Sequence, residues 1–159
     1  MARSSPQAAW ALLATGLLAA ATAHALSVPG VEGPKQKKCT IAGTWVNDLG
    51  SRVVFSAADN SGAFSGSYLT AVSASDNAIQ ESPLHGVQHD PGRRAQPTLG
   101  FVVHWTFSAS TTAFAGQCFV DAAGEETLET LWLLREEVPS RADDWKATRV
   151  GRNVFTRVK

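Results

Sequence analysis

The sequence predicts an all-β fold, an eight-stranded antiparallel up-and-down β-barrel, from three observations. From Cys39 onward, short runs of β-branched and aromatic residues alternate with turn-forming clusters at intervals of about 8 to 14 residues. Every connection is short enough for a hairpin, so strands adjacent in sequence are expected to be antiparallel neighbours. No helix is predicted to cover a face of the sheet, and eight such strands protect their edges best by closing into a barrel.

Each predicted strand is bounded by residues that favour turns, chiefly Gly, Pro, Asn, Asp and Ser. In chain order, the strands are predicted at 40–47, 52–57, 63–70, 78–89, 98–107, 112–121, 126–135 and 146–157. The clusters that separate most of them are AADNSG, AVSASDN, HDPGRRAQP, SAST and DAAGEE. The last connection differs, because it places a tryptophan, Trp145, among charged residues.

The segment before the barrel has two predicted parts. Residues 1–25 form a secretory signal peptide, with Arg3, an Ala/Leu-rich run and the small-x-small sequence Ala23-His24-Ala25. Residues 26–38 are rich in Pro, Gly and Lys and are expected to form a flexible arm. The barrel domain then spans 39–159. Removing 25 of 159 residues leaves a secreted, extracellular chain of 134.

The charge of the chain bears on its possible partners, and its two cysteines bear on the compartment in which it folds. Without Arg3 the chain has 13 Lys and Arg against 14 Asp and Glu, a formal charge of −1. This balance gives no reason to expect nucleic acid or a membrane as a partner. The two cysteines, Cys39 and Cys118, are expected to form a disulfide in an oxidising compartment.

The hairpin topology predicts that aromatic and hydroxyl side chains gather at one rim of the barrel. The ends of odd strands and the starts of even strands share that rim, which receives Trp105, SAST (108–111) and the AVSASDN loop (71–77). Residues two apart share a face of a strand. One phase of alternation brings the following side chains into the lumen: Trp45, Asn47, Phe64, Tyr68, Thr70, Phe101, Val103, Trp105, Phe107, Thr112, Phe114, Leu128, Trp132 and Leu134.

An apolar floor below a polar mouth indicates a small ligand, because the buried hydroxyl and amide groups would otherwise lack partners. At Leu131–Leu134 both faces of the predicted strand are apolar, so the outer face there is expected to be covered as well. In a chain without predicted helices, the surface that covers this strand is expected to come from another subunit.

Six segments resemble the avidin family of biotin-binding proteins, with the same spacing from Cys39 to the C-terminus. They are CTIAGTWVNDLGS (39–51), SGSYLTAVSAS (65–75), ESPLHGVQ (81–88), QPTLGFVVHWTFSASTTAFAGQCF (96–119), LWLL (131–134) and DDWKATRVGRNVFTR (143–157). The resemblance implies a homotetramer of eight-stranded barrels, with one biotin per barrel and one intrachain disulfide.

The resemblance also implies roles for single residues. Donors to the ureido oxygen of biotin would be Asn47, Ser51 and Tyr68. Acceptors of its two N–H groups would be Thr70 and Asn153, with Thr112 facing the ring sulfur. The carboxylate would be held by Ser73, Ala74, Ser75, Ser108 and Ser110. The rings would lie among Trp105, Phe107, Phe114 and Trp132, beside Leu49, Val72 and Leu134.

Trp145 matches the tryptophan that, in the family, caps the site of a neighbouring subunit. The resemblance therefore implies a side chain that is exposed in a monomer and buried in the assembly. One departure concerns the same assembly, because Arg152 stands where the family has an isoleucine that helps subunits pack. The implied role is sequestration of biotin, as an antimicrobial or antinutrient protein.

The alternatives are weaker matches to the residues. His85 and His89 are four apart on a predicted strand and span about 13 Å, too far for one metal ion. No nucleophile with a neighbouring base is visible, so neither catalysis nor a cofactor is expected. A lipocalin-like carrier would share Gly43-Thr44-Trp45 but would require an apolar lumen without the hydroxyl ring. A secreted enzyme or a structural secreted protein also remains open.

Overall fold

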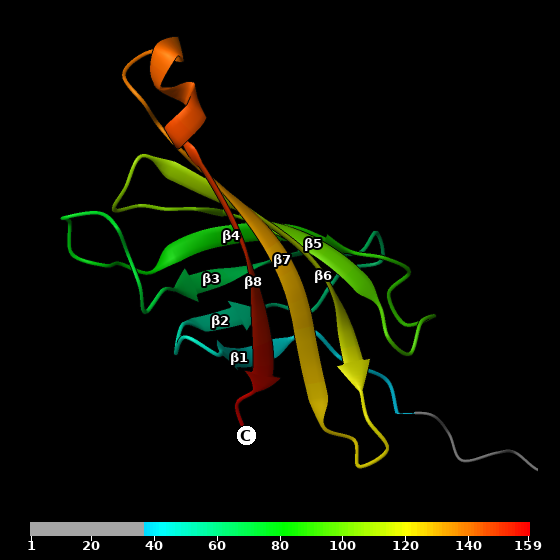
Figure 1. The fold of residues 1–159 in the computed structure, drawn as a ribbon. Coiled ribbons are helices and arrows are strands. Elements are labelled where there is room, and N and C mark those ends of the chain that lie inside the picture. Colours follow the sequence, from blue (N-terminus) through cyan, green and yellow to red (C-terminus); the bar gives the residue numbers. More distant parts are fainter. Residues whose placement is uncertain (1–36) are drawn as a thin grey trace, which may run out of the picture. The chain divides into compact units, whose positions relative to one another are not determined.

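The computed structural model describes residues 37–159, which form a closed antiparallel barrel (Figure 1). Each strand pairs with the next along the chain, and β1 pairs with β8 to close the sheet. The strands are β1 Gly43–Asn47, β2 Arg52–Phe55, β3 Ala63–Leu69, β4 Ser82–Gln88, β5 Thr98–His104, β6 Ser110–Val120, β7 Glu126–Glu136 and β8 Thr148–Arg157. The predicted fold class and all eight strands are confirmed.

Two predicted strand boundaries are wrong because hydrogen bonds hold the neighbouring residues outside the ladder. The fourth strand begins at Ser82 and not at 78, because the preceding loop is tied elsewhere, with Asn77 Nδ2 donating to Phe107 O over 2.8 Å. The fifth ends at His104, because Trp105 N donates to Ser110 O and the chain turns there.

One short element was not predicted, a 3₁₀ helix at Arg141–Lys146, η1. Asp143 stabilises this turn by accepting from the Ser140 hydroxyl over 2.7 Å and pairing with Lys146 over 2.8 Å. The last strand therefore starts at Thr148 and not at 146. Among the described residues, no helix is long and apolar enough to cross a membrane.

The predicted inward-facing side chains form one core. Trp45, Phe101 and Phe114 are nearly inaccessible to solvent, and the Phe101 and Phe114 rings stack with centroids 4.5 Å apart. Burial of each large side chain contributes about 1.5 to 3 kcal/mol. The alternation predicted from the sequence is thus confirmed, and it leaves its polar members Asn47 and Thr112 buried near the mouth.

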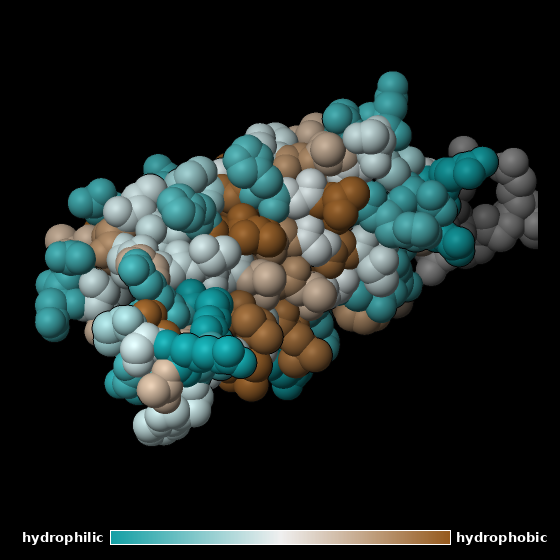
Figure 2. Space-filling view, turned by 90° about the horizontal axis from the view of Figure 1, so that it is seen from above, coloured by the Kyte–Doolittle hydropathy of each residue, from teal (hydrophilic) through white to brown (hydrophobic). Residues whose placement is uncertain are grey.

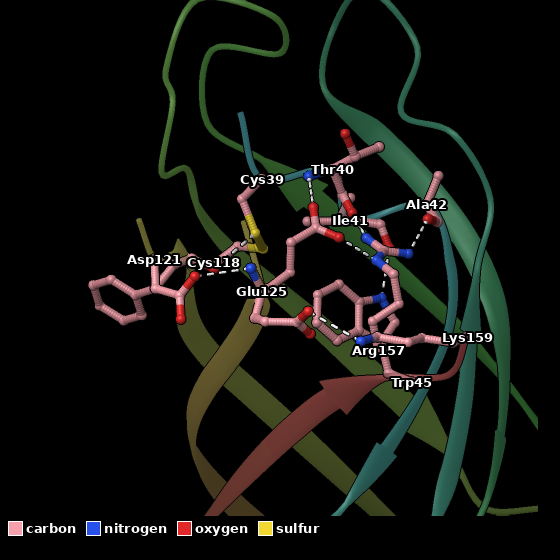
Figure 3. A network of polar contacts seen from close by, with 12 residues as sticks. Cys39, Thr40, Ile41, Ala42, Trp45, Cys118, Asp121, Glu125, Arg157 and Lys159 are labelled. Carbon is pink, nitrogen blue, oxygen red and sulfur yellow. Dashed lines mark hydrogen bonds and ion pairs between the residues drawn. A yellow bond between two sulfur atoms is a disulfide. The ribbon is translucent and has the colours of Figure 1, made fainter. Parts of the chain in front are cut away.

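The end of the barrel away from the mouth is closed by Arg157 (Figure 3). Its guanidinium lies 4.3 Å from the centre of the Trp45 ring, pairs with Glu126 and donates to Ala42 O over 2.8 Å. Glu126 also accepts from Thr40 N over 2.7 Å, so one carboxylate joins the first residues of the barrel to its last strand.

Arg157→Met is expected to lower the free energy of unfolding by about 1 to 3 kcal/mol, because the partly buried Glu126 loses its counter-charge. Urea unfolding measures this change. The matched control is Lys159→Met, whose ion pair with Glu125 is largely exposed and is expected to contribute about 1 kcal/mol or less. Equal losses in both variants would contradict the role given to Arg157.

The predicted disulfide is confirmed. Cys39 and Cys118 are bonded, with Cα atoms 5.9 Å apart and a sequence separation of 79 residues. This bond lies at the same end of the barrel as Arg157 (Figure 3). The predicted signal peptide (1–25) and residues 26–36 of the predicted arm lie outside the described residues.

The outer face of the C-terminal strands is apolar and exposed. On β7, Leu131 and Leu133 are 67% and 46% exposed, and Val150 on β8, the Cα partner of Leu133, is 73% exposed. Figure 2 shows that hydrophobic residues gather in the middle of one face of the molecule, between hydrophilic residues. On the same outer surface, Arg152 pairs with Glu129 over 3.6 Å.

Candidate functional site

A cavity of about 290 Å³ opens at the predicted rim, where β1 joins β2, β3 joins β4, β5 joins β6 and β7 joins β8. Its size is close to the lower limit for small-molecule sites, about 300 Å³. Sixteen of the nineteen predicted ligand residues line it: Ser51, Tyr68, Thr70, Val72, Ser73, Ala74, Ser75, Trp105, Phe107, Ser108, Ser110, Thr112, Phe114, Trp132, Leu134 and Asn153.

Three predicted residues do not line the cavity. Asn47 is buried behind it and supports Tyr68. Leu49 lies in the β1–β2 turn and is 51% exposed. Trp145 lies on η1 and is 82% exposed. The exposure of Trp145 in the single chain agrees with what the resemblance implies for a monomer.

Two lining residues, Glu136 and Arg149, were missed by the sequence analysis. Alternation could have found Glu136, because it lies two residues after Leu134 on the same face of β7. The strand was predicted to end at residue 135, one residue before Glu136, so the pattern ended at Leu134.

The polar end of the cavity is held by Asn47. Its Oδ1 accepts from Ser51 N over 2.8 Å and from Leu49 N over 3.0 Å, which fixes the β1–β2 turn. Its Nδ2 lies 3.3 Å from the Tyr68 hydroxyl. Because both lone pairs of Oδ1 are used, the amide nitrogen is directed toward Tyr68 and the interior. Asn47, Ser51 and Tyr68 thus bring three N–H or O–H donors together.

Asn153, on β8, supplies the opposite polarity. Its Nδ2 donates to Asp48 Oδ1 over 3.0 Å, which leaves the side-chain oxygen of Asn153, Oδ1, available as an acceptor. This hydrogen bond is the main cause that lowers the pKa of Asp48. The Asp48 carboxylate therefore fixes the orientation of the Asn153 amide.

Tyr68 is expected to titrate far above an ordinary tyrosine. Burial of its ring, more than any other cause, raises the pKa of Tyr68 from 10.0 to about 12, and the negative charge of Asp48 adds to this. The unfolded chain therefore loses this proton at a lower pH than the folded chain. The stability from the buried neutral phenol is fully present below pH 10 and is lost between pH 10 and about 12, by about 2 to 3 kcal/mol.

Tyr68 is the single tyrosine of the chain, so phenolate absorbance reports on it alone. The expected midpoint is near 12 in the folded protein and near 10 in denaturant. The Tyr68→Phe variant removes this titration and gives the baseline. A folded-state midpoint near 10 would show that the phenol is open to water.

Aromatic rings form the walls of the cavity. Trp105 Nε1 donates to Thr112 Oγ1 over 2.8 Å, which directs the indole, and the Phe107 ring lies 5.8 Å from Trp105. Trp132 packs against β8 at Gly151, where an added Cβ would come within 2.3 Å of the indole. Among the described residues, Trp132 Nε1 is the one buried polar side-chain atom without a hydrogen-bond partner.

Hydroxyl groups of two loops form the outer part of the site. Ser108 Oγ and Ser110 Oγ, from the β5–β6 loop and the start of β6, are 2.6 Å apart. The β3–β4 loop is fastened to them through Phe107, whose carbonyl accepts from Ser75 Oγ over 3.5 Å and from Asn77 Nδ2 over 2.8 Å. Small hydroxyls at a cavity mouth can donate to an anion or an amide.

The barrel is closed, and the cavity at its mouth has aromatic walls with both hydrogen-bond donors and acceptors. These features define a small-molecule-binding β-barrel. The chain matches the model of the avidin family over residues 35–158. It therefore belongs to the avidin family. This is a family of binding proteins without enzymatic activity, and the described residues contain no group of three side chains able to hold a metal ion.

Individual relatives agree with this assignment. Avidin of Gallus gallus is 53% identical over 135 residues, which cover 85% of this chain and 87% of that protein. Avidin-related protein 1 of Gallus gallus is 52% identical over 133 residues, covering 84% and 85%. A solved biotin-binding protein from chicken is 61% identical with a TM-score of 0.73, covering 77% of this chain and 98% of that chain. Xenavidin is 45% identical with a TM-score of 0.72, covering 77% and 100%.

Proposed function

We propose that this protein binds biotin with high affinity, one molecule in the cavity of each chain. The observation that carries the proposal is an aromatic cavity lined by the donors Ser51 and Tyr68, which Asn47 supports from behind, and by the acceptor Asn153. Three donors suit the oxygen of a cyclic urea, and preorganised donors bind a polarised carbonyl strongly. The match to a chicken biotin-binding protein supports the same ligand.

The remaining proposed roles are those that the family resemblance implies. Thr70 and Asn153 accept from the two urea N–H groups, and Thr112 lies against the ring sulfur. The aromatic walls, Trp105, Phe107, Phe114 and Trp132, enclose the rings together with Val72 and Leu134. The outer polar groups, Ser73, Ala74, Ser75, Ser108 and Ser110, receive the carboxylate. Leu49, which lies outside the cavity, covers the ligand from the β1–β2 turn.

A titration with biotin tests the proposal. Tryptophan fluorescence is expected to change and to saturate at one biotin per chain, with a large rise in the unfolding temperature, since a ligand that binds the folded state alone stabilises it. No response to biotin would reject the proposal. A response to long-chain lipids in its place would favour a lipocalin-like carrier.

The protein is further proposed to form a homotetramer. The support is the exposed apolar surface of β7 and β8, with Leu131, Leu133 and Val150 left open to solvent in the single chain. Light scattering is expected to give the mass of four chains, and Leu131→Glu is expected to lower it. A monomeric mass for the unmodified protein would reject this assembly.

Trp145 is proposed to cap the site of a neighbouring subunit. It is 82% exposed on η1, and Asp144 of the same helix is paired with Arg135 of β7, which fastens η1 to the barrel. Trp145→Lys is expected to speed biotin dissociation by about 30-fold or more, since truncated hot-spot aromatics cost about 2 kcal/mol or more.

Competition with unlabelled biotin measures that rate. The matched control is Arg141→Ala, an exposed residue of the same helix, for which no change is expected. Unchanged dissociation in Trp145→Lys would exclude the capping role, provided the variant keeps the mass of the unmodified assembly.

Secretion is proposed on the leader 1–25, the arm 26–38 and the disulfide of the barrel domain 39–159. Mass spectrometry of the protein recovered from culture medium is the direct test, and a mature N-terminus at Leu26 is expected. A tightly binding secreted protein would sequester biotin from microorganisms, an antimicrobial or antinutrient role.

A further inference from the structure

The mouth of the cavity contains one charged pair to which the family resemblance gave no role. Glu136, at the end of β7, and Arg149, near the start of β8, both line the cavity. Arg149 Nη1 donates to Glu136 Oε2 over 2.8 Å. They are the two lining side chains that are charged at neutral pH.

The pair lies beside the hydroxyls of the outer site. Ser110 is the Cα partner of Glu136 across β6 and β7, and directly opposed residues in such a ladder are about 5 Å apart. Ser110 in turn is bonded to Ser108. A ligand tail that reaches these two hydroxyls therefore ends next to the ion pair.

We propose that the Glu136–Arg149 pair determines which charge the site accepts at the end of the ligand tail. The inference rests on the proposed biotin function, since it concerns the same cavity. While the pair is intact, its opposite charges largely cancel at the tail, so a carboxylate and an uncharged amide are both accepted. A single charge left alone would favour one of them, because the partly enclosed mouth screens charges less than bulk water does.

The pair can be altered without loss of the fold. The side chains of Arg149 and Glu136 are 51% and 45% exposed, and ion pairs at such exposure contribute little to folding. Glutamine keeps the length and polarity of Glu136, so Glu136→Gln removes charge with little change of shape, and Arg149→Gln replaces the guanidinium by a shorter, uncharged polar group. A second ion pair of the same two strands, Arg152 with Glu129, lies on the outer surface and supplies the matched control.

The experiment measures the dissociation rates of biotin and of its uncharged carboxamide from the full-length protein and its variants. The quantity compared is the ratio of the amide rate to the biotin rate. Relative to the unmodified protein, we expect this ratio to rise about five-fold in Glu136→Gln, where the free Arg149 holds the carboxylate. We expect it to fall about five-fold in Arg149→Gln, where the free Glu136 repels the carboxylate.

The double variant is expected to return to the ratio of the unmodified protein, and added salt is expected to reduce both single-variant shifts. Glu129→Gln and Arg152→Gln are expected to leave the ratio unchanged. If both ligands bind and the ratio stays constant in every variant, the pair does not sense the tail and the inference is overturned, while the biotin function stands. If the unmodified protein binds neither ligand, both this inference and the proposed biotin function are rejected.

Discussion

Trp105→Ala is expected to weaken biotin binding by about 30- to 1000-fold, corresponding to about 2 to 4 kcal/mol. Trp105 is 8% exposed, lines the cavity and donates to Thr112 from its indole nitrogen. Alanine removes the wall that contacts the ligand and also frees the Thr112 hydroxyl to turn. Dissociation rates measured by competition, together with association rates, give the affinity.

Loss of the fold has to be separated from loss of the site, because Trp105 also packs against Tyr68 with ring centroids 5.3 Å apart. Trp105→Phe keeps most of the ring area and removes the donor, so it is expected to lose less affinity than alanine. Val87→Ala, on an exposed position of β4, is the control for which no change is expected. Full affinity in a folded Trp105→Ala protein would show that the ligand does not lie against this wall.

The double variant Cys39→Ala/Cys118→Ala is expected to lose about 2 to 5 kcal/mol of unfolding free energy in the absence of ligand. The bond closes a loop with a sequence separation of 79, so its removal frees a long segment of the unfolded chain. Urea unfolding of the unliganded protein measures the loss.

The same variant separates stability from binding. Cys118 lies near the end of β6, at the rim opposite the cavity, so biotin stoichiometry is expected to remain one per chain. Unfolding of the unmodified protein under reducing conditions is expected to match the variant. An unchanged unfolding free energy would show that the barrel ladders alone fix the N-terminal strand. Lost biotin binding in a folded variant would show that the two rims are coupled.

The sequence predicted most of the residues that line the cavity, because alternation along strands is a local property. Phe101, Val103, Trp105 and Phe107 occupy every second position, and all four are buried. Hairpin connectivity then placed the even-strand starts and odd-strand ends at one mouth, which is where the cavity lies. A strict period and short connections leave few other arrangements.

The failures share one cause, which is competition from contacts between distant parts of the chain. Residues 78–81 have strand-like spacing, but the loop is fastened to Phe107 and stays out of the ladder. Glu136 was left out of the lumen because the strand was predicted to end at residue 135, whereas β7 continues to Glu136. In the structure, Arg149 of β8 pairs with Glu136. The sequence of β7 alone cannot predict that pairing, because the partner comes from another strand.

The sequence by itself determined the all-β class, the eight strands, their inward faces, the disulfide and the family, because strand period, turn chemistry and motif spacing are local along the chain. The tertiary structure decided where strands end, that Asn47 supports the site from behind, that residues 141–146 form a helix with Trp145 in solvent, and that Glu136 meets Arg149. These features depend on hydrogen bonds and ion pairs between strands, and such bonds form only when closure of the barrel brings the partners together.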